Sequence, residues 1–402
     1  MLKPMTLRGQ LPRGVQDWFL ADAAQRADIE ARIAQVFRTW GYSQLIPPTF
    51  EYYENLALGL SANVQEATYR FLDHRGHTLA LRPDLTIQTA RIVGTKLYDQ
   101  PMPQRYFYVE PVFRYIEVQA GRQREFTQAG IELLGASTPA ADAEVVAVAI
   151  AALRAAGLSD FRVSIGHLDF FRALLTEAGL SRDAMESVQE AIDRKSRTSV
   201  RAALNGNHAR AAYALEQLPS LVGGPEVLDR AGELAPWPAA QAALDNLAAI
   251  YDWLARAGLA EPIIIDLGEV RGMNYYTGLT FEAFAAGMGF ALLNGGRYDH
   301  LVGQFGPDCP SVGFALGVDR LMMALGEAET AAHLPDALVA YSDDPACLAA
   351  IAQLREAGRR IEMDVLGRAP SALREYARAR GIPAVLVWNG ERLAAPSQES
   401  ER

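Results

Sequence analysis

The sequence predicts an α+β protein in which helices flank a mostly antiparallel sheet and a small α/β unit follows. Three observations support this prediction. Two stretches with strand character, Tyr106–Glu117 and Phe126–Leu133, are joined by a polar loop, as in a long hairpin. A predominantly helical stretch over 168–259 then interrupts the strand-rich part as an insertion. Beyond Pro335, strands and helices alternate in the order of a small βαβαβ unit.

The individual elements follow from apolar spacing and from glycine and proline positions. The first helix, Ala21–Trp40, has apolar residues at helical spacing and ends before Gly41. Gly313 and Gly317 are interpreted as breaks before the last helix of the main body. Further strands are predicted at Ser43–Ile46, Thr78–Arg82, Phe161–Ile165, Pro262–Leu267, Leu279–Phe284 and Phe290–Asn294, and further helices at Thr86–Ile92, Ala140–Ala156 and Val318–Leu325.

Two domains are expected. The first spans 1–330 and contains the helical insertion at about 168–259, with a Pro/Gly break at Pro219–Pro225. The second spans 335–402 and ends in a charged, frayed tail. Its predicted elements are the strands Asp336–Tyr341, Arg360–Leu366 and Pro383–Trp388 and the helices Pro345–Ala357 and Pro370–Arg380.

Composition excludes several classes of protein. The chain has 402 residues and a formal net charge of -10, which gives no electrostatic help in binding a nucleic acid. Cys309 and Cys347 have no metal or disulfide spacing and are typical of a reducing cytoplasm. His74 and His77 lack the further ligands of a metal site. The apolar run Val145–Leu153 is too short to cross a bilayer. We therefore expect a cytoplasmic protein without nucleic-acid or membrane partners.

Polar residues recur on strands that otherwise look apolar. Gln128 and Glu132 share one face of the second hairpin strand. A solvent-facing stripe is the simplest interpretation, and a polar ligand inside the protein is the alternative. Other polar residues on the same predicted sheet favour the ligand. The candidate set is Asp84, Thr86, Arg114, Gln128, Glu132, Arg271, Tyr275, Tyr276 and Tyr298.

This set suits a free amino acid with a basic ring. Asp84, helped by Thr86 and Gln128, suits an α-ammonium group. The two arginines of the set suit an α-carboxylate or a phosphate. Glu132, together with tyrosine hydroxyls, suits a ring N–H such as that of imidazole.

At these residues the sequence resembles class II aminoacyl-tRNA synthetases, and specifically histidyl-tRNA synthetase, over roughly Leu11 to Leu325. The segment ending at Pro48 resembles motif 1, which builds the dimer interface of that family. Phe113–Glu132 resembles motif 2, and GFALGVDRL (Gly313–Leu321) resembles motif 3. The stretches RGMNYY and GGRYD are similar to the two histidine-specific motifs.

Departures from the synthetase pattern concern the nucleotide. Motif 2 of the synthetase reads Phe-Arg-x-Glu, and its glutamate binds adenine. Here Ile116 occupies that position and Glu117 comes one residue late, on the opposite face if the strand continues. RPEGT becomes RPDLT with Leu85 at a glycine position, and RGLDYY becomes RGMNYY with Asn274 for aspartate. The C-terminal region resembles an anticodon-binding domain that ends early.

A chain that keeps the histidine pocket and loses the adenine contact resembles the regulatory subunits of ATP phosphoribosyltransferase. The resemblance implies a non-catalytic subunit without catalytic residues, cofactor or metal. It implies a short-form catalytic subunit as partner, a role in the first step of histidine biosynthesis, feedback by histidine, and self-association through motif 1. Histidine could bind the candidate set or a subunit interface. The alternatives are an active histidyl-tRNA synthetase with an unusual motif 2, and a stand-alone amino-acid-binding or ligase relative.

Overall fold

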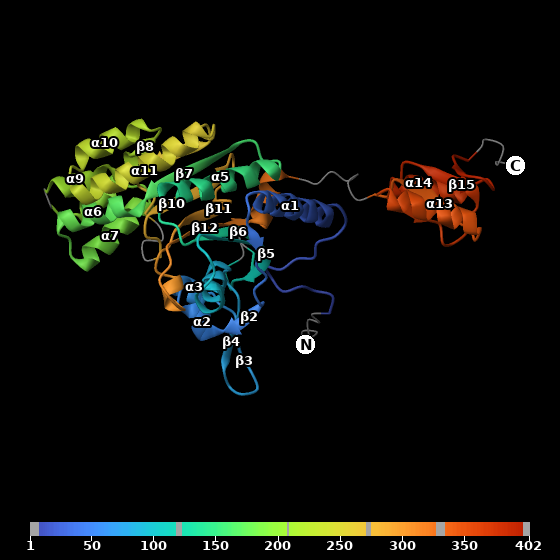
Figure 1. Ribbon diagram of the computed structural model, residues 1–402, viewed down its shortest axis with the longest axis horizontal. Coiled ribbons are helices and arrows are strands. Elements are labelled where there is room, and N and C mark those ends of the chain that lie inside the picture. Colours follow the sequence, from blue (N-terminus) through green and yellow to red (C-terminus); the bar gives the residue numbers. More distant parts are fainter. Residues whose placement is uncertain (1–7, 118–122, 207–208, 271–274, 327–333, 397–402) are drawn as a thin grey trace, which may run out of the picture. The chain divides into compact units, whose positions relative to one another are not determined.

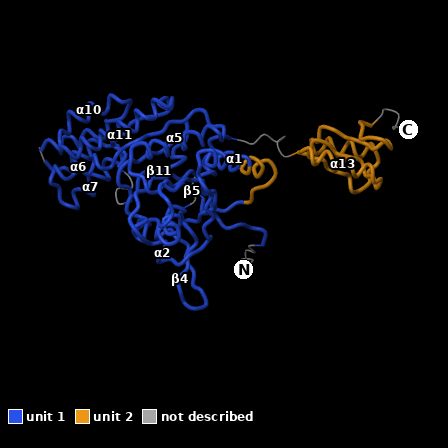
Figure 2. Tube along the Cα trace, viewed as in Figure 1, with its two compact units in different colours: residues 1–16, 28–326 blue, residues 17–27, 327–402 orange. Residues whose placement is uncertain are grey.

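A computed structural model describes residues 8–117, 123–206, 209–270, 275–326 and 334–396. The chain divides into two compact units, one of 1–16 with 28–326 and the other of 17–27 with 327–402 (Figure 2). In the described ranges, no helix has the length and apolar character that crossing a membrane requires.

The larger unit is built on a nine-stranded sheet in the order β1-β5-β6-β12-β11-β10-β7-β9-β8 (Figure 1). Neighbouring strands are antiparallel except for the β1–β5 and β7–β9 pairs, so the predicted, mostly antiparallel sheet is confirmed. The strands are β1 (Ser43–Gln44), β5 (Gln104–Phe113), β6 (Glu125–Leu134), β7 (Phe161–His167), β8 (Val222–Gly223), β9 (Ile263–Asp266), β10 (Leu279–Ala285), β11 (Leu293–Arg297) and β12 (Ser311–Gly317).

Helices cover this sheet with their apolar sides. In α1 (Leu20–Thr39), the buried Phe37 ring meets the rings of Phe107 on β5 and Phe314 on β12, at centroid distances of 5.6 and 6.0 Å. This contact explains why apolar residues recur at helical spacing there. The other covering helices are α4 (Thr86–Ile92), which a π-helical turn η1 (Val93–Leu97) continues, α5 (Pro139–Ala155) and α12 (Val318–Leu325).

The predicted insertion is largely helical, but it also joins the sheet. The expected break at Pro219–Pro225 contains β8, which pairs with β9 and forms the edge of the nine-stranded sheet. The prediction of an insertion without sheet structure is therefore wrong at this point. The helices of the insertion are α6 (Leu168–Ala178), α7 (Arg182–Asp193), α8 (Arg197–Ala203), α9 (Arg210–Gln217), α10 (Glu226–Leu234) and α11 (Pro238–Arg256).

Two smaller sheets complete the chain. In the larger unit, β2 (Phe50–Tyr52), β4 (Thr78–Leu81) and β3 (Arg70–Leu72) form an antiparallel sheet beside α2 (Tyr53–Ala57) and α3 (Ala62–Glu66). The other sheet has the order β14-β13-β15-β16, and its last strand was not predicted. Its elements are β13 (Ala337–Val339), α13 (Pro345–Glu356), β14 (Ile361–Met363), α14 (Pro370–Arg380), β15 (Val385–Trp388) and β16 (Leu393–Ala394).

Three strand predictions need correction. β5 ends at Phe113 and does not reach Glu117, and β11 starts three residues later than predicted, at Leu293. β12 was missed because its glycines were interpreted as breaks. In the structure Gly313 faces Glu132 across the β12–β6 pair, and a Cβ atom there would collide with the glutamate carboxylate. The glycine therefore makes room for a buried side chain inside a continuous strand.

Candidate functional site

A cavity of about 320 Å³, lined by both polar and apolar residues, opens over the sheet, within the size range of about 300–1,000 Å³ usual for small-molecule sites. Asn294 and Arg320, which lie outside the predicted histidine-binding set, also line it, and Arg320 is the arginine of the segment that resembles motif 3. Arg271 lies outside the described residues. Seven of the nine predicted residues line the cavity, namely Asp84, Thr86, Arg114, Gln128, Tyr275, Tyr276 and Tyr298.

Glu132 lies behind the cavity wall. Its side chain is fully buried, and its two oxygens accept hydrogen bonds from the hydroxyls of Tyr108, at 3.0 Å, and of Tyr298. Burial raises the pKa of Glu132 from 4.5 to about 8, although the hydroxyl groups around it act in the opposite direction. The interpretation as a solvent-facing stripe is therefore wrong, because Gln128 is also buried.

Sequence reasoning also missed Tyr108, which connects Glu132 to the front of the site. Tyr108 is fully buried on β5 opposite Gly130, where a Cβ atom would approach its ring to 2.7 Å. The Tyr108 hydroxyl lies 3.4 Å from that of Thr86. The sequence did contain a signal for Tyr108, namely Gly130 at the opposite position of the predicted hairpin.

A cluster of tyrosines forms one wall. The rings of Tyr275 and Tyr298 stack with centroids 5.5 Å apart, and Tyr276 meets Tyr275 edge-on at 4.9 Å. Burial raises the pKa of all three hydroxyls, which therefore stay protonated and act as hydrogen-bond donors. Gly296 leaves room for the ring of Tyr276, because a Cβ atom at position 296 would lie only 2.8 Å from that ring.

An acid–base pair also lines the cavity. Asp84 Oδ2 lies 3.5 Å from Arg114 Nη2, and Asp84 Oδ1 accepts the backbone N–H of Thr86 at 2.8 Å. Arg114 Nε donates to the carbonyl of Pro83 at 2.8 Å. Asp84 thus stabilises the start of α4 and also faces the cavity. Both charged side chains remain partly exposed, at 28% for Arg114 and 22% for Asp84.

Gln128 carries an unsatisfied amide. The residue is 6% exposed, and its Oε1 atom has no hydrogen-bond partner among the described residues. A buried polar atom without a partner destabilises a fold by about 1–3 kcal/mol. Because Gln128 lines the cavity, a turn of its side chain would bring this amide oxygen to a ligand that donates a hydrogen bond.

A second cavity of about 260 Å³ adjoins the first and shares Arg114, Phe126 and Arg320 with it. Ile116 and Met323 contribute apolar side chains to its wall. Both Ile116 and Glu117 lie beyond the end of β5, so strand alternation does not place them. Ile116 nevertheless lines the second cavity, whereas Glu117 is exposed at the surface.

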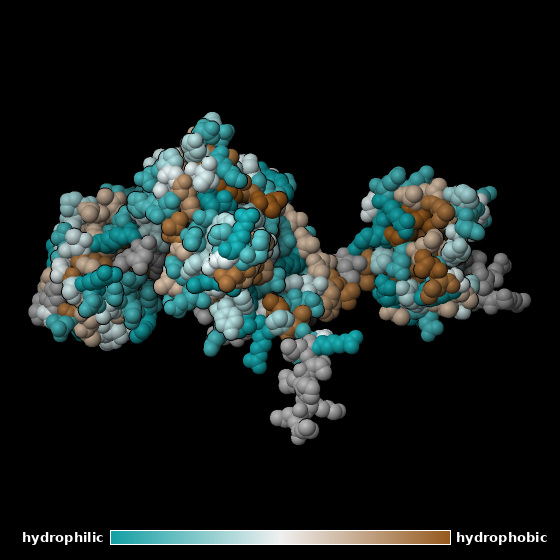
Figure 3. Space-filling view, turned by 90° about the horizontal axis from the view of Figure 1, so that it is seen from below, coloured by the Kyte–Doolittle hydropathy of each residue, from teal (hydrophilic) through white to brown (hydrophobic). Residues whose placement is uncertain are grey.

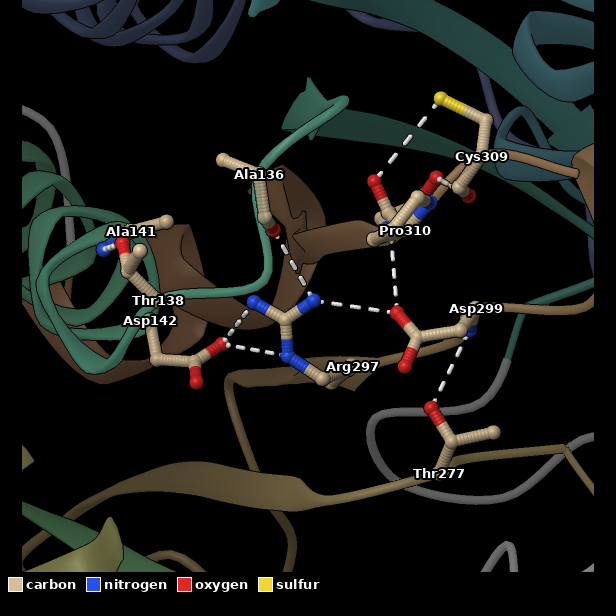
Figure 4. Close-up of polar contacts among 10 residues, drawn as sticks. Ala136, Thr138, Ala141, Asp142, Thr277, Arg297, Asp299, Cys309 and Pro310 are labelled. Carbon is tan, nitrogen blue, oxygen red and sulfur yellow. Dashed lines mark hydrogen bonds and ion pairs between the residues drawn. The ribbon is translucent and has the colours of Figure 1, made fainter.

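A buried ion-pair network supports the tyrosine wall (Figure 4). Arg297, the residue before Tyr298, donates through Nε and Nη2 to Asp142 Oδ1 at 3.0 and 2.7 Å. Its Nη1 donates to Asp299 Oδ1 at 3.0 Å. Burial raises the pKa of Asp142 to about 6, and Arg297 opposes this shift. Asp142 lies in the first turn of α5, so this ion pair joins the start of that helix to the end of β11.

Comparison with known proteins places these features in a family. The family model described as histidyl-tRNA synthetase matches residues 14–321. The chain is 40% identical over 392 residues to the ATP phosphoribosyltransferase regulatory subunit of Desulforamulus reducens, covering 95% of this chain and 96% of that protein. It is 38% identical to the protein of the same name from Geobacter metallireducens, covering 98% and 93%.

Solved structures agree with this picture. An ATP phosphoribosyltransferase regulatory subunit/histidyl-tRNA synthetase from Bacillus halodurans superposes with a TM-score of 0.83 at 30% identity, covering 94% of this chain and 98% of that one. Histidyl-tRNA synthetase from a Nostoc species superposes with a TM-score of 0.80 at 22% identity, covering 94% and 91%, which shows a shared fold.

Proposed function

This chain belongs to the histidyl-tRNA synthetase-like family of ATP phosphoribosyltransferase regulatory subunits, and we propose that it binds free histidine in its polar cavity and reports histidine levels to a short-form catalytic subunit. The observation that carries this proposal is the unsatisfied, buried Gln128 amide in the cavity wall. The amide oxygen can accept a hydrogen bond from an α-ammonium group. The Asp84 carboxylate, which also lines the cavity, can accept another from the same group.

The other walls suit the remaining parts of histidine. Arg114 provides a guanidinium for the α-carboxylate, once the ligand's ammonium group competes for Asp84. The hydroxyls of Tyr275 and Tyr276 suit the imidazole ring. Glu132 acts from behind by fixing the hydroxyl of Tyr298.

We propose that the chain has no catalysis of its own. Histidine activation would require a nucleotide next to the amino acid, and the cavity that adjoins the histidine site is lined by Ile116 and Met323. Ile116 stands where the synthetase motif has its adenine-binding glutamate, and an isoleucine side chain cannot accept a hydrogen bond from the adenine amino group. We therefore expect regulation of a partner enzyme in the first step of histidine biosynthesis, in the cytoplasm.

We also propose self-association through the segment that resembles motif 1. Apolar patches interrupt the hydrophilic surface of the face shown in Figure 3. Ile46, two residues after β1, is 72% exposed, and Phe50 on β2 is 52% exposed. Exposed apolar residues next to an edge strand suit a protein–protein interface.

Calorimetric titration with L-histidine tests the binding proposal. We expect saturable binding by the wild type and at least about tenfold weaker binding by Gln128→Ala, because a hydrogen bond to a charged group is lost. Gln217→Ala is the matched control, since Gln217 Nε2 is also buried without a hydrogen-bond partner among the described residues but Gln217 does not line the cavity. Equal affinities of wild type and Gln128→Ala would contradict the proposed site.

A further inference from the structure

The buried side chain of Arg82 holds the segment that we propose for self-association, Ile46–Phe50, which we call the association segment. Arg82 follows β4 directly, and only 1% of the residue is exposed. Its Nη1 donates to the carbonyl of Pro47 at 2.7 Å, and its backbone N–H donates to the carbonyl of Thr49 at 3.0 Å. One residue thus binds two carbonyls of the association segment.

The same guanidinium group also binds β5. Its Nε donates to the carbonyl of Pro111 at 2.7 Å, and its Nη2 donates to Glu110 Oε2 at 2.9 Å. Each of its three nitrogens therefore has its own acceptor, an arrangement that depends on the planar fork of an arginine. The Arg82 side chain joins the association segment to a central part of the fold.

The residues that follow Arg82 belong to the cavity. The carbonyl of Pro83 accepts a hydrogen bond from Arg114 Nε at 2.8 Å, and Asp84 lines the cavity together with Arg114. Asp84 Oδ2 also lies 3.5 Å from Arg114 Nη2. Three consecutive residues, 82–84, therefore connect the association segment to the carboxylate that we propose for the ammonium group of the ligand.

Helix α4 makes a second connection to the association segment. Gln88 Nε2 donates to the carbonyl of Pro48 at 2.8 Å and to Glu51 Oε1 at 3.1 Å. Thr86, at the start of the same helix, lines the cavity. Because Pro47 and Pro48 have no backbone N–H, they cannot pair fully with a neighbouring strand. The side chains of Arg82 and Gln88 bind their carbonyls instead.

We propose that Arg82 is a positioning residue through which histidine binding in the cavity and self-association at Ile46–Phe50 strengthen each other. The inference rests on the proposed histidine binding and self-association. A second copy that orders the association segment also orders Arg82 and the adjacent Asp84, so histidine binding then costs less conformational entropy. Histidine must in turn strengthen self-association by the same factor.

An aspartate in the association segment separates the two copies without touching the cavity. Ile46 is 72% exposed and does not line the cavity, so Ile46→Asp should fold and carry a charge that opposes the apolar contact. Val222→Asp is the matched control. Val222 is also an exposed β-branched residue, and it lies in β8, at the opposite edge of the nine-stranded sheet from β1.

Sedimentation velocity and calorimetric titration with L-histidine, both on the full chain, measure self-association and affinity. We expect the wild type and Val222→Asp to be dimers with the same Kd for histidine. Ile46→Asp should be a monomer whose Kd is higher by about fivefold or more, the lower end of typical couplings between sites.

Arg82→Lys tests whether this residue carries the coupling. Lysine keeps the charge beside Glu110 but cannot also bind the carbonyls of Pro47 and Pro111. We expect Arg82→Lys to self-associate more weakly and to bind histidine about as weakly as Ile46→Asp, and the double variant to bind no more weakly than either. If Arg82→Lys does not fold, Glu110→Gln replaces it in this comparison, because it weakens the hold on the same guanidinium group at a side chain that is 20% exposed.

An unchanged Kd in Ile46→Asp would overturn the proposal, as would a monomeric wild type or a dimeric Ile46→Asp. Additive losses of affinity in the double variant would also overturn it, because Arg82 would then act independently of self-association. Equal losses in Val222→Asp and Ile46→Asp would indicate an effect of surface charge alone and would overturn it too. If the wild type takes up no histidine, the proposed function fails. Self-association of Arg82→Lys then decides whether Arg82 holds the association segment, and an unchanged dimer would contradict this.

Discussion

Glu132→Gln should change how the stability of the protein depends on pH. Burial raises the pKa of Glu132 from 4.5 to about 8, so the folded chain keeps a proton there that the unfolded chain releases. Between these two pKa values the folded state binds one proton more. This group therefore makes the free energy of unfolding fall by about 1.4 kcal/mol per pH unit as the pH rises through that window.

Comparison of the two proteins isolates this effect. Glutamine at position 132 does not titrate, so from pH 6.5 to 8.0 the wild type should lose about 2 kcal/mol of unfolding free energy relative to Glu132→Gln. Urea denaturation of both ligand-free proteins at several pH values measures the difference. Groups that titrate alike in both proteins, such as Asp142 and His167, contribute equally to both unfolding free energies, so their contributions cancel in the difference. A constant difference across this range would refute the reasoning, because Glu132 would then have the same pKa folded and unfolded.

Three further predictions follow from the site. Gly313→Ala places a methyl group against the Glu132 carboxylate, so we expect a loss of about 1–3 kcal/mol in urea denaturation together with weaker histidine binding; wild-type behaviour in both assays would contradict the packing described. Arg297→Met leaves Asp142 buried without its cation and should cost about 3–5 kcal/mol, and adding Asp142→Leu should restore part of this loss. A double variant no more stable than Arg297→Met would argue against an uncompensated charge. Histidine-dependent exchange of pyrophosphate into ATP should be absent, and its presence would establish the synthetase alternative.

Sequence patterns predicted those elements whose bounds depend on neighbouring residues in the chain. The helix Thr86–Ile92 has the predicted bounds, because its start depends on Asp84 two residues before it. Most of the polar set also converges on one cavity, because the predicted strands and helix that carry it meet over one sheet.

Long-range contacts account for what the sequence could not predict. Gly313 resembled a break because the carboxylate that requires it belongs to another strand, at Glu132. The buried pair of Asp142 and Arg297 could not be predicted, because the two residues are 155 positions apart in the chain.

Feedback in the assembled complex tests the central claim most directly. The chain is combined with the short-form ATP phosphoribosyltransferase from the same organism, and activity is measured against histidine concentration. We predict that activity depends on this chain and that histidine lowers it. The Gln128→Ala complex should stay active and need about tenfold more histidine or greater for the same inhibition. Equal histidine sensitivity of the two complexes would contradict the cavity as the feedback site and would place that site at a subunit interface.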